Sequence, residues 1–462
     1  MPPIIDHEQI ENSVIMNGYY DNKKLFYRNV FWFLFGNAAA SFGVYTAQSN
    51  LMPLHMAANN LNAQKISTIL ALSGWIGMPL GLYFAYLSDR WQWKMGRRLP
   101  FIAISLPFIL LAMIIFPYAT GFWSCLGVFT IFLIFNQVKF AAYPYLMNDI
   151  SKQKYWGRIG GIGGVAQWIA VWLGQRVLMP MIDIRGEKQV YFIAACFVGI
   201  ATVLTIIFVK EPPYRSPEPP KFNPVPVIWS TLKFGFSSKR NVLLYLAFSF
   251  ICASALVNIY IPLQGKVNLG LTDGQVGLMI LQYGTLSVVA LSFFMGWAVD
   301  KIGSVKCLII GFTLLAPSVL LGSSPVFASG IINKSLGTSF SGINVLAAAY
   351  IIATIGGSFN FTAAYILVMS SVHRKDVAKF MACNGALNVF MQSILLAITG
   401  VLITNLFNEQ YGVAFIIAFI FVIFGVIIFV VIGKQNNKIT SVISEDTNST
   451  NGIINVKKQN SI

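Results

Sequence analysis

Long apolar segments, repeated along almost the whole chain, limit this sequence to a fold embedded in a lipid bilayer. A helix needs about 20 predominantly apolar residues to cross the hydrocarbon core. The chain has 462 residues, of which 56% are hydrophobic and 10% charged, and it contains twelve such segments. They lie at about 29–49, 64–87, 99–118, 122–145, 157–179, 189–209, 241–262, 273–297, 304–322, 343–371, 377–400 and 411–433. The sequence therefore predicts an all-α membrane protein with twelve transmembrane helices.

Composition excludes several other classes of protein. A soluble domain usually carries about a quarter charged residues, far more than this chain. A net charge of +16 could indicate nucleic-acid binding, but the basic residues lie between apolar segments, so no nucleic-acid partner is expected. The five cysteines stand singly and predict neither a disulfide framework nor a metal site. We expect no cofactor, and the first 28 residues contain no pattern of a cleavable signal peptide.

The distribution of basic residues predicts the orientation. With the N-terminus inside, 25 of the 32 Lys and Arg residues fall in or beside inner segments. The outer loops hold five, namely Lys65, Arg185, Lys188, Lys266 and Lys334. Because inner loops of membrane proteins are enriched in Lys and Arg, we expect a multi-pass plasma-membrane protein with both termini in the cytoplasm.

A proline-rich segment divides the twelve spans into two sets of six. Seven prolines between Lys210 and Pro226 favour a stiff, extended linker. Two pseudo-symmetric halves around a midplane site are the plan of many secondary transporters. The predicted parts are a cytoplasmic N-terminal tail at 1–28, a six-helix bundle at 29–209, the linker at 210–240, a second six-helix bundle at 241–433, and a disordered cytoplasmic tail at 434–462.

Two segments at equivalent places in the halves resemble each other. One follows the second span and the other follows the eighth, and each has an aspartate at the helix end, a basic neighbour and a glycine turn. Such a carboxylate can accept hydrogen bonds from a facing helix N-terminus, and the arginines can reach acidic partners or lipid phosphates. The repeat predicts a cytoplasmic latch that breaks when the halves rock, although a plain basic loop would also orient the chain. The residues are Asp89, Arg90, Gly96, Arg97 and Arg98 in the first copy, and Asp300, Lys301 and Gly303 in the second.

The second copy, Asp300-Lys-Ile-Gly303, resembles the loop signature of the major facilitator superfamily. The resemblance to that superfamily covers about residues 29–433. The first copy has a longer spacing, with seven residues from Asp89 to Gly96. Its ending, Gly-Arg-Arg-Leu-Pro-Phe-Ile, resembles plant sucrose–proton symporters, their animal relatives and, more distantly, the glycoside–pentoside–hexuronide symporters. The resemblance implies a transporter of a sugar or glycoside that works by alternating access, with proton coupling left open.

The segment that joins the fourth and fifth spans adds two candidate gating residues. Asp149 ends the fourth span, and Arg158 follows at the start of the fifth. The family resemblance implies that Asp149 pairs with Arg97 or Arg98. The alternative is a loop acid beside loop bases, which contributes little by itself.

Polar side chains recur on one face of several spans. Polar groups are costly in a bilayer and usually face an aqueous cavity or a partner helix. Amides both donate and accept hydrogen bonds, which suits a hydroxyl-rich ligand. The candidate binding residues are Asn37, Tyr45, Asn136, Lys139, Tyr143, Gln167, Asn258, Gln282, Asn360, Asn384 and Asn388, and Ser41, Gln48 and Gln392 share these faces.

Lys139 is the charged residue that lies well inside a predicted span, and three interpretations remain open. The alternatives are that Lys139 binds an anionic ligand, that it titrates as a switch, or that its side chain extends to the inner membrane surface. Arg176, nearer the outer end of its span, is expected to extend to the outer surface. The 16 acidic residues lie in tails, loops or helix ends, and His7, His55 and His373 are expected outside the spans. Sodium coupling is therefore not expected.

The sequence favours a monomeric secondary transporter of a small polar solute, a sugar or glycoside. A carrier or exporter of an organic anion, with Lys139 as charge partner, is the alternative. A transport-inactive membrane sensor or scaffold is a third. An enzyme is not expected, because no span or loop assembles a nucleophile with a base or with metal ligands.

Overall fold

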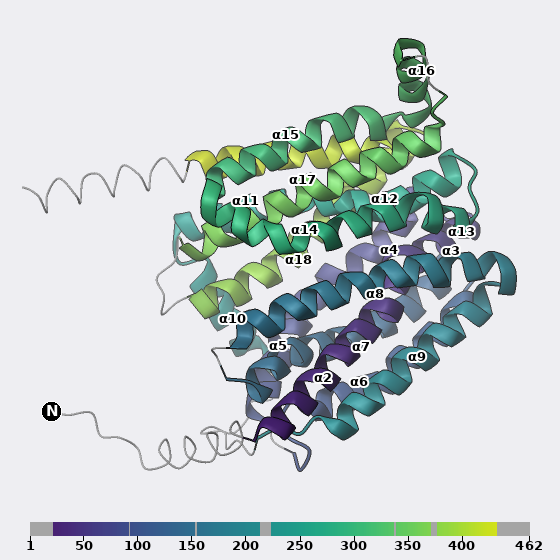
Figure 1. Cartoon of the computed structure of the whole chain (residues 1–462). Helices are drawn as coiled ribbons and strands as arrows, with labels where there is room; N and C mark the ends of the chain where they lie inside the picture. The colour runs from purple at the N-terminus through teal and green to yellow at the C-terminus, as the bar shows by residue number, and fades with distance from the viewer. Residues whose placement is uncertain are drawn as a thin grey trace, which may run out of the picture.

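The computed structural model describes residues 22–91, 93–152, 155–212, 223–336, 339–370 and 377–431. In this part of the chain the secondary structure is helical, and long helices run side by side in two groups (Figure 1). The predicted tails beyond these limits, the prolines of 213–222, His7 and His373 lie outside the described residues.

The first half runs from the first to the sixth predicted span. Its elements are α2 (Lys23–Ala40), the π-helical turns η1 (Ser41–Tyr45) and η2 (Ala47–Leu51), α3 (Met52–Ala58), α4 (Ala63–Trp75), α5 (Gly77–Arg90), α6 (Leu99–Ile115), η3 (Phe116–Tyr118), α7 (Phe122–Ile150), α8 (Trp156–Arg185) and α9 (Glu187–Phe208). Polar side chains begin two of these helices: the Asn22 side chain accepts from the Leu25 N–H, and Asn62 accepts from the Lys65 N–H. Such caps satisfy backbone donors that a helix start leaves free.

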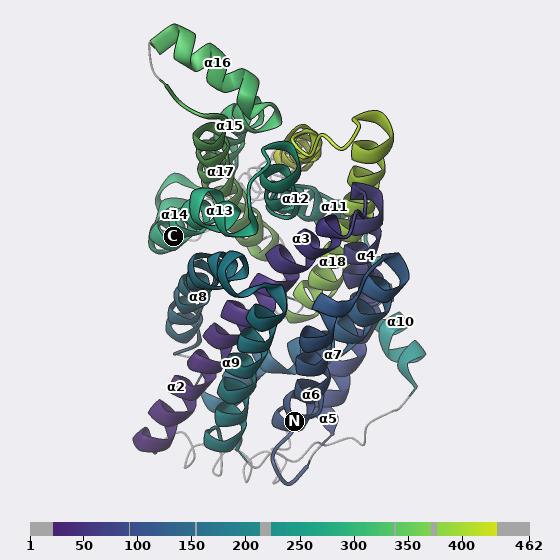
Figure 2. The same ribbon diagram turned by 90° about the vertical axis from the view of Figure 1, so that its right-hand side faces the viewer.

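The second half is built in the same way. Its elements are α10 (Pro224–Gly235), α11 (Lys239–Cys252), η5 (Ala253–Ala255), α12 (Leu256–Leu263), the π-helical turn η6 (Gln264–Asn268), α13 (Asp273–Val276), the π-helical turn η7 (Gly277–Leu281), α14 (Gln282–Ile302), α15 (Ser304–Ser323), α16 (Pro325–Leu336), α17 (Gly342–Ser370), α18 (Val377–Leu406) and a last helix, Val413–Val431. Short α16 projects from the bundle between α15 and α17 (Figures 1 and 2).

Eleven helices of the described residues are long and apolar enough to cross a membrane, and they coincide with every predicted span except the fifth. The fifth lies in α8, which has 30 residues but is less apolar because it contains glycines, amides and charged residues. Two sequence predictions need correction. The first span continues as one helix to Ala58, and part of the predicted extended linker forms α10 because proline is tolerated at the first turn of a helix.

The halves meet along two seams. One is formed by α4 and α18, and the other by α8 with α13, η7 and α14. Gly74 of α4 permits the first: a Cβ there would lie 2.4 Å from the Val389 carbonyl oxygen and 2.1 Å from the Ser393 hydroxyl. Small residues let helix backbones approach in this way. Below, the end where α2 begins and α9 ends is the linker face, and the end where α3 ends and α4 begins is the opposite face.

Candidate functional site

A cavity of about 660 Å³, which includes the open space at its mouth, lies between the first span, α7 and α8. Its lining is polar at most positions, although it is surrounded by apolar helices. The lining residues are Asn37, Ala40, Ser41, Val44, Tyr45, Gln48, Asn136, Lys139, Phe140, Tyr143, Pro144 and Gln167. Six of the eleven predicted binding residues therefore come together around one space.

The local backbone explains how the first span supplies so many of these side chains. Ser41 and Tyr45 lie on η1, and Gln48 lies on η2, so the helix is widened where it borders the cavity. Single π-helical turns inside α-helices are frequent at functional sites. On α7 the spacing of Asn136, Lys139 and Tyr143 places all three on one face of a regular helix.

Lys139 is the electrostatic centre of this cavity. Its side chain is 5% exposed, and no acceptor in the described part of the chain hydrogen-bonds to its Nζ. The Nζ lies 5.7 Å from the centre of the Tyr143 ring, a distance at which the ring face attracts a cation. Of the three interpretations of Lys139, extension to the inner surface does not agree with this burial. No acceptor of the described residues therefore offsets the cost of burying a charge at this position.

Two neighbours of Lys139 are held in place by hydrogen bonds. The Tyr143 hydroxyl donates to the Phe33 carbonyl of α2 at 2.7 Å, so its ring rather than its hydroxyl faces Lys139. The Asn136 amide donates to the Gln48 side-chain oxygen at 3.5 Å, which links α7 to the first span. The cavity thus offers one fixed amide pair, Asn136 with Gln48, and one cation, Lys139, on the same face of α7 as Asn136.

A second cavity, of about 370 Å³, crosses from the first half to the second. It shares Tyr45 with the first cavity, and it includes the predicted residue Asn258. Its lining is Tyr45, Ser49, Asn50, Trp168, Val171, Gln175, Asn258, Thr285, Val288, Tyr350 and Thr354. The Thr285 hydroxyl donates to Gln175 Oε1 at 2.7 Å and joins the halves here. Sequence reasoning missed Gln175, although it stands beside Arg176 in the fifth span.

Four other predicted binding residues have different neighbours. Gln282 accepts a 2.8 Å hydrogen bond from Arg176, which is itself exposed, so the extension of Arg176 to the outer surface stays a prediction. Asn360 is fully buried where α17 packs on Gly311 of α15. Asn384 is buried on α18, and Asn388 lies one turn further along that helix. These four are not in the linings of the two cavities, because a polar helix face can also meet a neighbouring helix.

The residues of the predicted first latch copy form a charged cluster at the linker face, but their printed ion pairs lie within the first half and do not join it to the second, as a latch between the halves would. Arg97 Nε donates to the Asp149 carboxylate at 2.9 Å, and Arg98 Nε donates to it at 3.3 Å. Arg98 also contacts Asp89 and the Ser88 hydroxyl. The Arg98 and Asp149 side chains are 4% and 8% exposed, whereas Asp89 is 55% exposed. Asp149 therefore pairs with both arginines rather than with one of them.

Glu211, which follows α9, belongs to the same cluster but was not predicted. Its carboxylate accepts from the backbone N–H groups of Arg97 at 2.8 Å, Arg98 at 3.0 Å and Leu99 at 2.6 Å, and so caps α6. Burial raises the pKa of the Glu211 carboxyl, and these hydrogen bonds oppose the shift. Gly96, with φ of +111°, turns the chain here, and a Cβ would lie 2.6 Å from the Glu211 carboxyl carbon.

The remaining predicted gating residues lie around this region or in the second copy. Arg90 packs over the Tyr86 ring at 4.2 Å, and Arg158 is exposed near the start of α8. In the second copy Lys301 packs over the Trp297 ring at 4.7 Å, and Gly303 turns the chain with φ of +91°. The Asp300 side chain lies outside the part that the structure describes.

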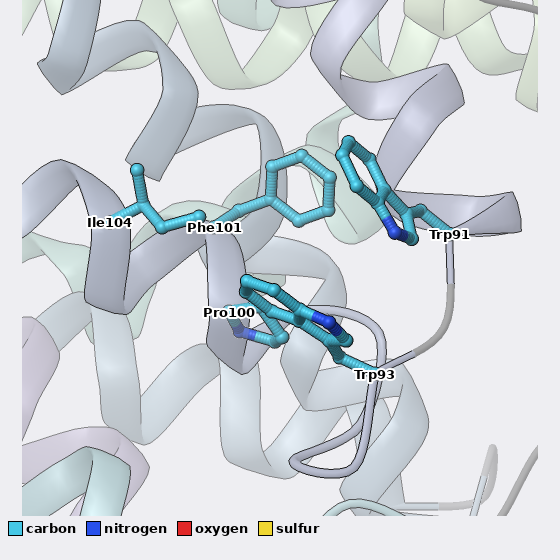
Figure 3. A pocket seen from close by; sticks show the side chains of 5 residues that line it. All are labelled: Trp91, Trp93, Pro100, Phe101 and Ile104. Atoms are coloured by element: carbon cyan, nitrogen blue, oxygen red, sulfur yellow. The ribbon is translucent and has the colours of Figure 1, made fainter.

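An apolar hollow lies at the start of α6, and Figure 3 shows the side chains that line it. Its lining residues are Trp91, Trp93, Pro100, Phe101 and Ile104, with Trp91 and Phe101 in edge-to-face contact at 6.1 Å. Because no polar side chain lines it, this hollow does not suit a polar solute. Tryptophan is enriched at the membrane–water boundary, which fits the place of the hollow at the start of α6.

Hydrogen bonds between the halves gather toward the opposite face. The Ala63 N–H donates to the Glu409 carboxylate at 3.0 Å, and the Gly274 N–H donates to Asp183 at 3.2 Å. Lys266 Nζ donates to the Leu54 carbonyl at 3.3 Å. These bonds hold the two halves together at this face.

His55 corrects one sequence prediction. It was expected in a loop outside the spans, but it lies in α3, continuous with the first span, and is 4% exposed. The first span was ended too early because its last residues are less apolar. A histidine is therefore buried near the opposite face, beside Glu187.

Comparison with known proteins identifies the family. A family model described as Major Facilitator Superfamily matches residues 33–281 and 266–452, which is most of the chain. This chain belongs to the Major Facilitator Superfamily. The match agrees with the helical architecture in two halves. It names the superfamily alone and does not confirm the narrower resemblance to sugar symporters.

Individual relatives are more distant. The quinolone resistance protein NorA of Staphylococcus aureus is 26% identical over 173 residues, which are 37% of this chain and 42% of NorA. The match thus spans about two fifths of that relative. A POT family transporter, solved with a thioalcohol-conjugated peptide, has 14% identity and a TM-score of 0.67 over 88% of this chain and 96% of its own. The nucleoside transporter NupG has 12% identity and a TM-score of 0.65, over 88% and 98%. These two structures share the fold.

Proposed function

We propose that this protein is a secondary transporter and that its solute is a small hydroxylated molecule with one acidic group. The single observation that carries the proposal is the Lys139 cavity, where a buried ammonium without a protein acceptor faces several amides and hydroxyls. Membership of the superfamily supports transport rather than enzyme catalysis. The named relatives support no particular solute for this chain.

The chemistry of the lining defines the solute. A carboxylate or a similar anion on the solute would pair with Lys139 and offset the cost of burying the ammonium. Solute hydroxyls would exchange hydrogen bonds with Asn37, Gln48 and Gln167, whose amides donate and accept. The sugar and anion interpretations of the sequence thereby combine in a sugar-sized acid.

Alternating access would follow from the two seams. The second cavity crosses between the halves and shares Tyr45 with the first, so a solute beside Tyr45 would contact both. Rocking of the halves around this point would expose the solute to one face at a time. Proton coupling is decided by the same test.

Uptake of labelled D-gluconate and its neutral counterpart D-sorbitol into proteoliposomes tests the proposal. Gluconate carries a carboxylate at the position where sorbitol carries a CH2OH group. We expect uptake of gluconate and little of sorbitol, with and without an inward proton gradient as separate arms. Gluconate accumulation driven by the gradient would indicate a symporter, and equilibration alone a facilitator.

Lys139→Gln gives the matched test of the charge, because glutamine keeps polarity and removes the cation. We expect gluconate affinity to fall about 10- to 100-fold, as for the loss of a charge-assisted hydrogen bond. Lys306→Gln, at an exposed site on α15, is the control and should transport as the unaltered protein does. Equal uptake of sorbitol, or unchanged gluconate affinity in Lys139→Gln, would overturn the acidic substrate. Absence of uptake of either probe would count against this pair of solutes and favour a sensor.

A further inference from the structure

Both ring nitrogens of His55 face oxygen acceptors. Nδ1 lies 2.8 Å and 2.9 Å from the two Glu187 carboxylate oxygens, and Nε2 lies 2.9 Å from the Ala119 carbonyl oxygen. Asn59 Nδ2 also approaches Nε2, at 3.2 Å, and donates to the His55 carbonyl at 2.9 Å; its two N–H groups allow both contacts. The ring thus sits between a carboxylate and a carbonyl in a water-poor place.

Only the charged imidazolium can donate from both nitrogens. A neutral ring with its N–H on Nδ1 could accept from Asn59 at Nε2, but the Nε2 lone pair would then also face the Ala119 carbonyl oxygen at 2.9 Å. The geometry therefore suits one proton shared by His55 and Glu187. The pair lies within the first half, on α3 and α9.

The charges around this pair come from both halves. Lys266 of η6 donates to Leu54, the neighbour of His55, and pairs with Asp273 of α13 at 2.7 Å. Asp183 of α8 accepts from the Thr272 hydroxyl at 2.6 Å across the seam. Other titratable groups nearby are Cys125, which donates to the same Ala119 carbonyl at 3.4 Å, and Tyr191, whose ring lies 6.1 Å from that of Phe116 beside His55.

Closure of the opposite face brings like charges together. Glu187 and Asp183 belong to the first half, and Asp273 belongs to the second, with Lys266 as the ammonium beside them. A proton on His55 adds one positive charge beside the carboxylates of Glu187, Asp183 and Asp273, in addition to the ammonium groups of Lys266 and Lys188. The proton therefore reduces repulsion between the halves at this face.

We propose that His55 and Glu187 form a proton-binding site, and that proton binding favours closure of the opposite face. This site is separate from the Lys139 cavity and does not depend on which solute is carried. It gives the chain a buried titratable group that sequence reasoning placed in a loop.

The experiment measures closure without any solute, so it stands apart from the uptake test. Spin labels at Gln189 and Asn408, which are exposed on opposite halves at this face, report the distance between the halves by electron–electron resonance. Exposed Cys196 is replaced by serine beforehand, and the other four cysteines are buried. We expect the ratio of closed to open molecules to rise about tenfold from pH 8 to pH 5, where histidine titrates.

Two variants test the assignment. His55→Gln keeps a polar side chain that does not titrate, and its closed fraction should be independent of pH. Glu187→Gln leaves His55 without its carboxylate, so the rise in closure should occur at lower pH. A pH dependence unchanged in either folded variant, or absent from the unaltered protein, would overturn the proposal. If one variant fails to fold, the other still decides.

Discussion

The two ends of the molecule are held together by different kinds of contact. At the linker face, Arg97 and Arg98 pair with Asp149, and these ion pairs join helices of the first half. At the opposite face, Glu409 and Lys266 of the second half bond to backbone groups of the first half. One set of contacts holds a half together, and the other holds the two halves to each other.

The difference separates stability from conformational change. A contact inside a half persists when the halves move as rigid bodies, whereas a contact between halves must break. We therefore expect changes at the linker-face cluster to lower the free energy of unfolding. Changes at the seams of the opposite face should instead shift the balance between closed and open states.

The largest expected effect is on Asp149. Asp149→Asn leaves two arginines, one of them 4% exposed, without their buried carboxylate. Loss of one partner from a buried pair costs about 3 kcal/mol or more. Thermal unfolding in detergent, followed by tryptophan fluorescence, should show a clear fall in the midpoint.

Asp89→Asn is the matched control for that prediction. Asp89 also contacts Arg98, but it is 55% exposed, so its loss should cost less than about 1 kcal/mol. If the two variants lowered the midpoint equally, burial would not be what makes the Asp149 pairs important.

The sequence predicts the contacts at a face only where the contacting residues lie close together along the chain or belong to a known motif. Asp89, Gly96, Arg97 and Arg98 lie in one short motif, and the family resemblance supplied Asp149. Glu211 lies more than a hundred residues from the groups that it caps, and no repeat or periodicity points to it. His55 and Glu187 are separated in the same way.

The cavity shows the same limit for helix faces. Spacing correctly grouped Asn37 with Tyr45 on the first span and Asn136 with Lys139 on α7, since residues three or four apart share a side of a helix. Spacing does not tell which neighbour that side meets. Asn360 therefore resembled a cavity residue in sequence, yet it packs against Gly311. The π-helical turns of the first span likewise have no signal in the pattern of apolar residues.

Gly74→Ala should act on the seam between the halves. The added Cβ would lie within 2.4 Å of the Val389 carbonyl oxygen, so α4 and α18 must separate. Overpacking of this kind costs about 2 kcal/mol. We expect the closed fraction reported by the Gln189–Asn408 label pair to fall strongly, with little change in the unfolding midpoint.

A matched glycine provides the control for the seam. Gly127 of α7 has no atom within 4 Å of an added Cβ, so Gly127→Ala should leave the closed fraction unchanged. A large fall in the unfolding midpoint of Gly74→Ala, without a change in the closed fraction, would contradict the separation of the two roles.

The smallest effect concerns Glu211, which joins the cluster to the segment after α9. Glu211→Ala leaves backbone N–H groups of α6 without an acceptor and should cost about 1 kcal/mol. Glu211→Gln keeps one acceptor oxygen, which can still serve Arg98 and Leu99, but places an NH2 group near the Arg97 N–H. At neutral pH it should therefore cost less than the alanine variant.

The pH dependence of stability, compared between the unaltered protein and Glu211→Gln, tests the effect of the Glu211 charge. Because burial raises the pKa of Glu211 from its ordinary value of 4.5, the folded chain holds this proton more tightly than the unfolded chain does. The contribution of Glu211 to stability is therefore greatest at low pH and declines as the pH rises through the raised pKa. Relative to Glu211→Gln, the unaltered protein should lose stability as the pH rises above about 4.5. A gain in stability over that range would mean that the hydrogen bonds from Arg97, Arg98 and Leu99 outweigh burial. Glu211 would then stabilise the linker face in its ionised form.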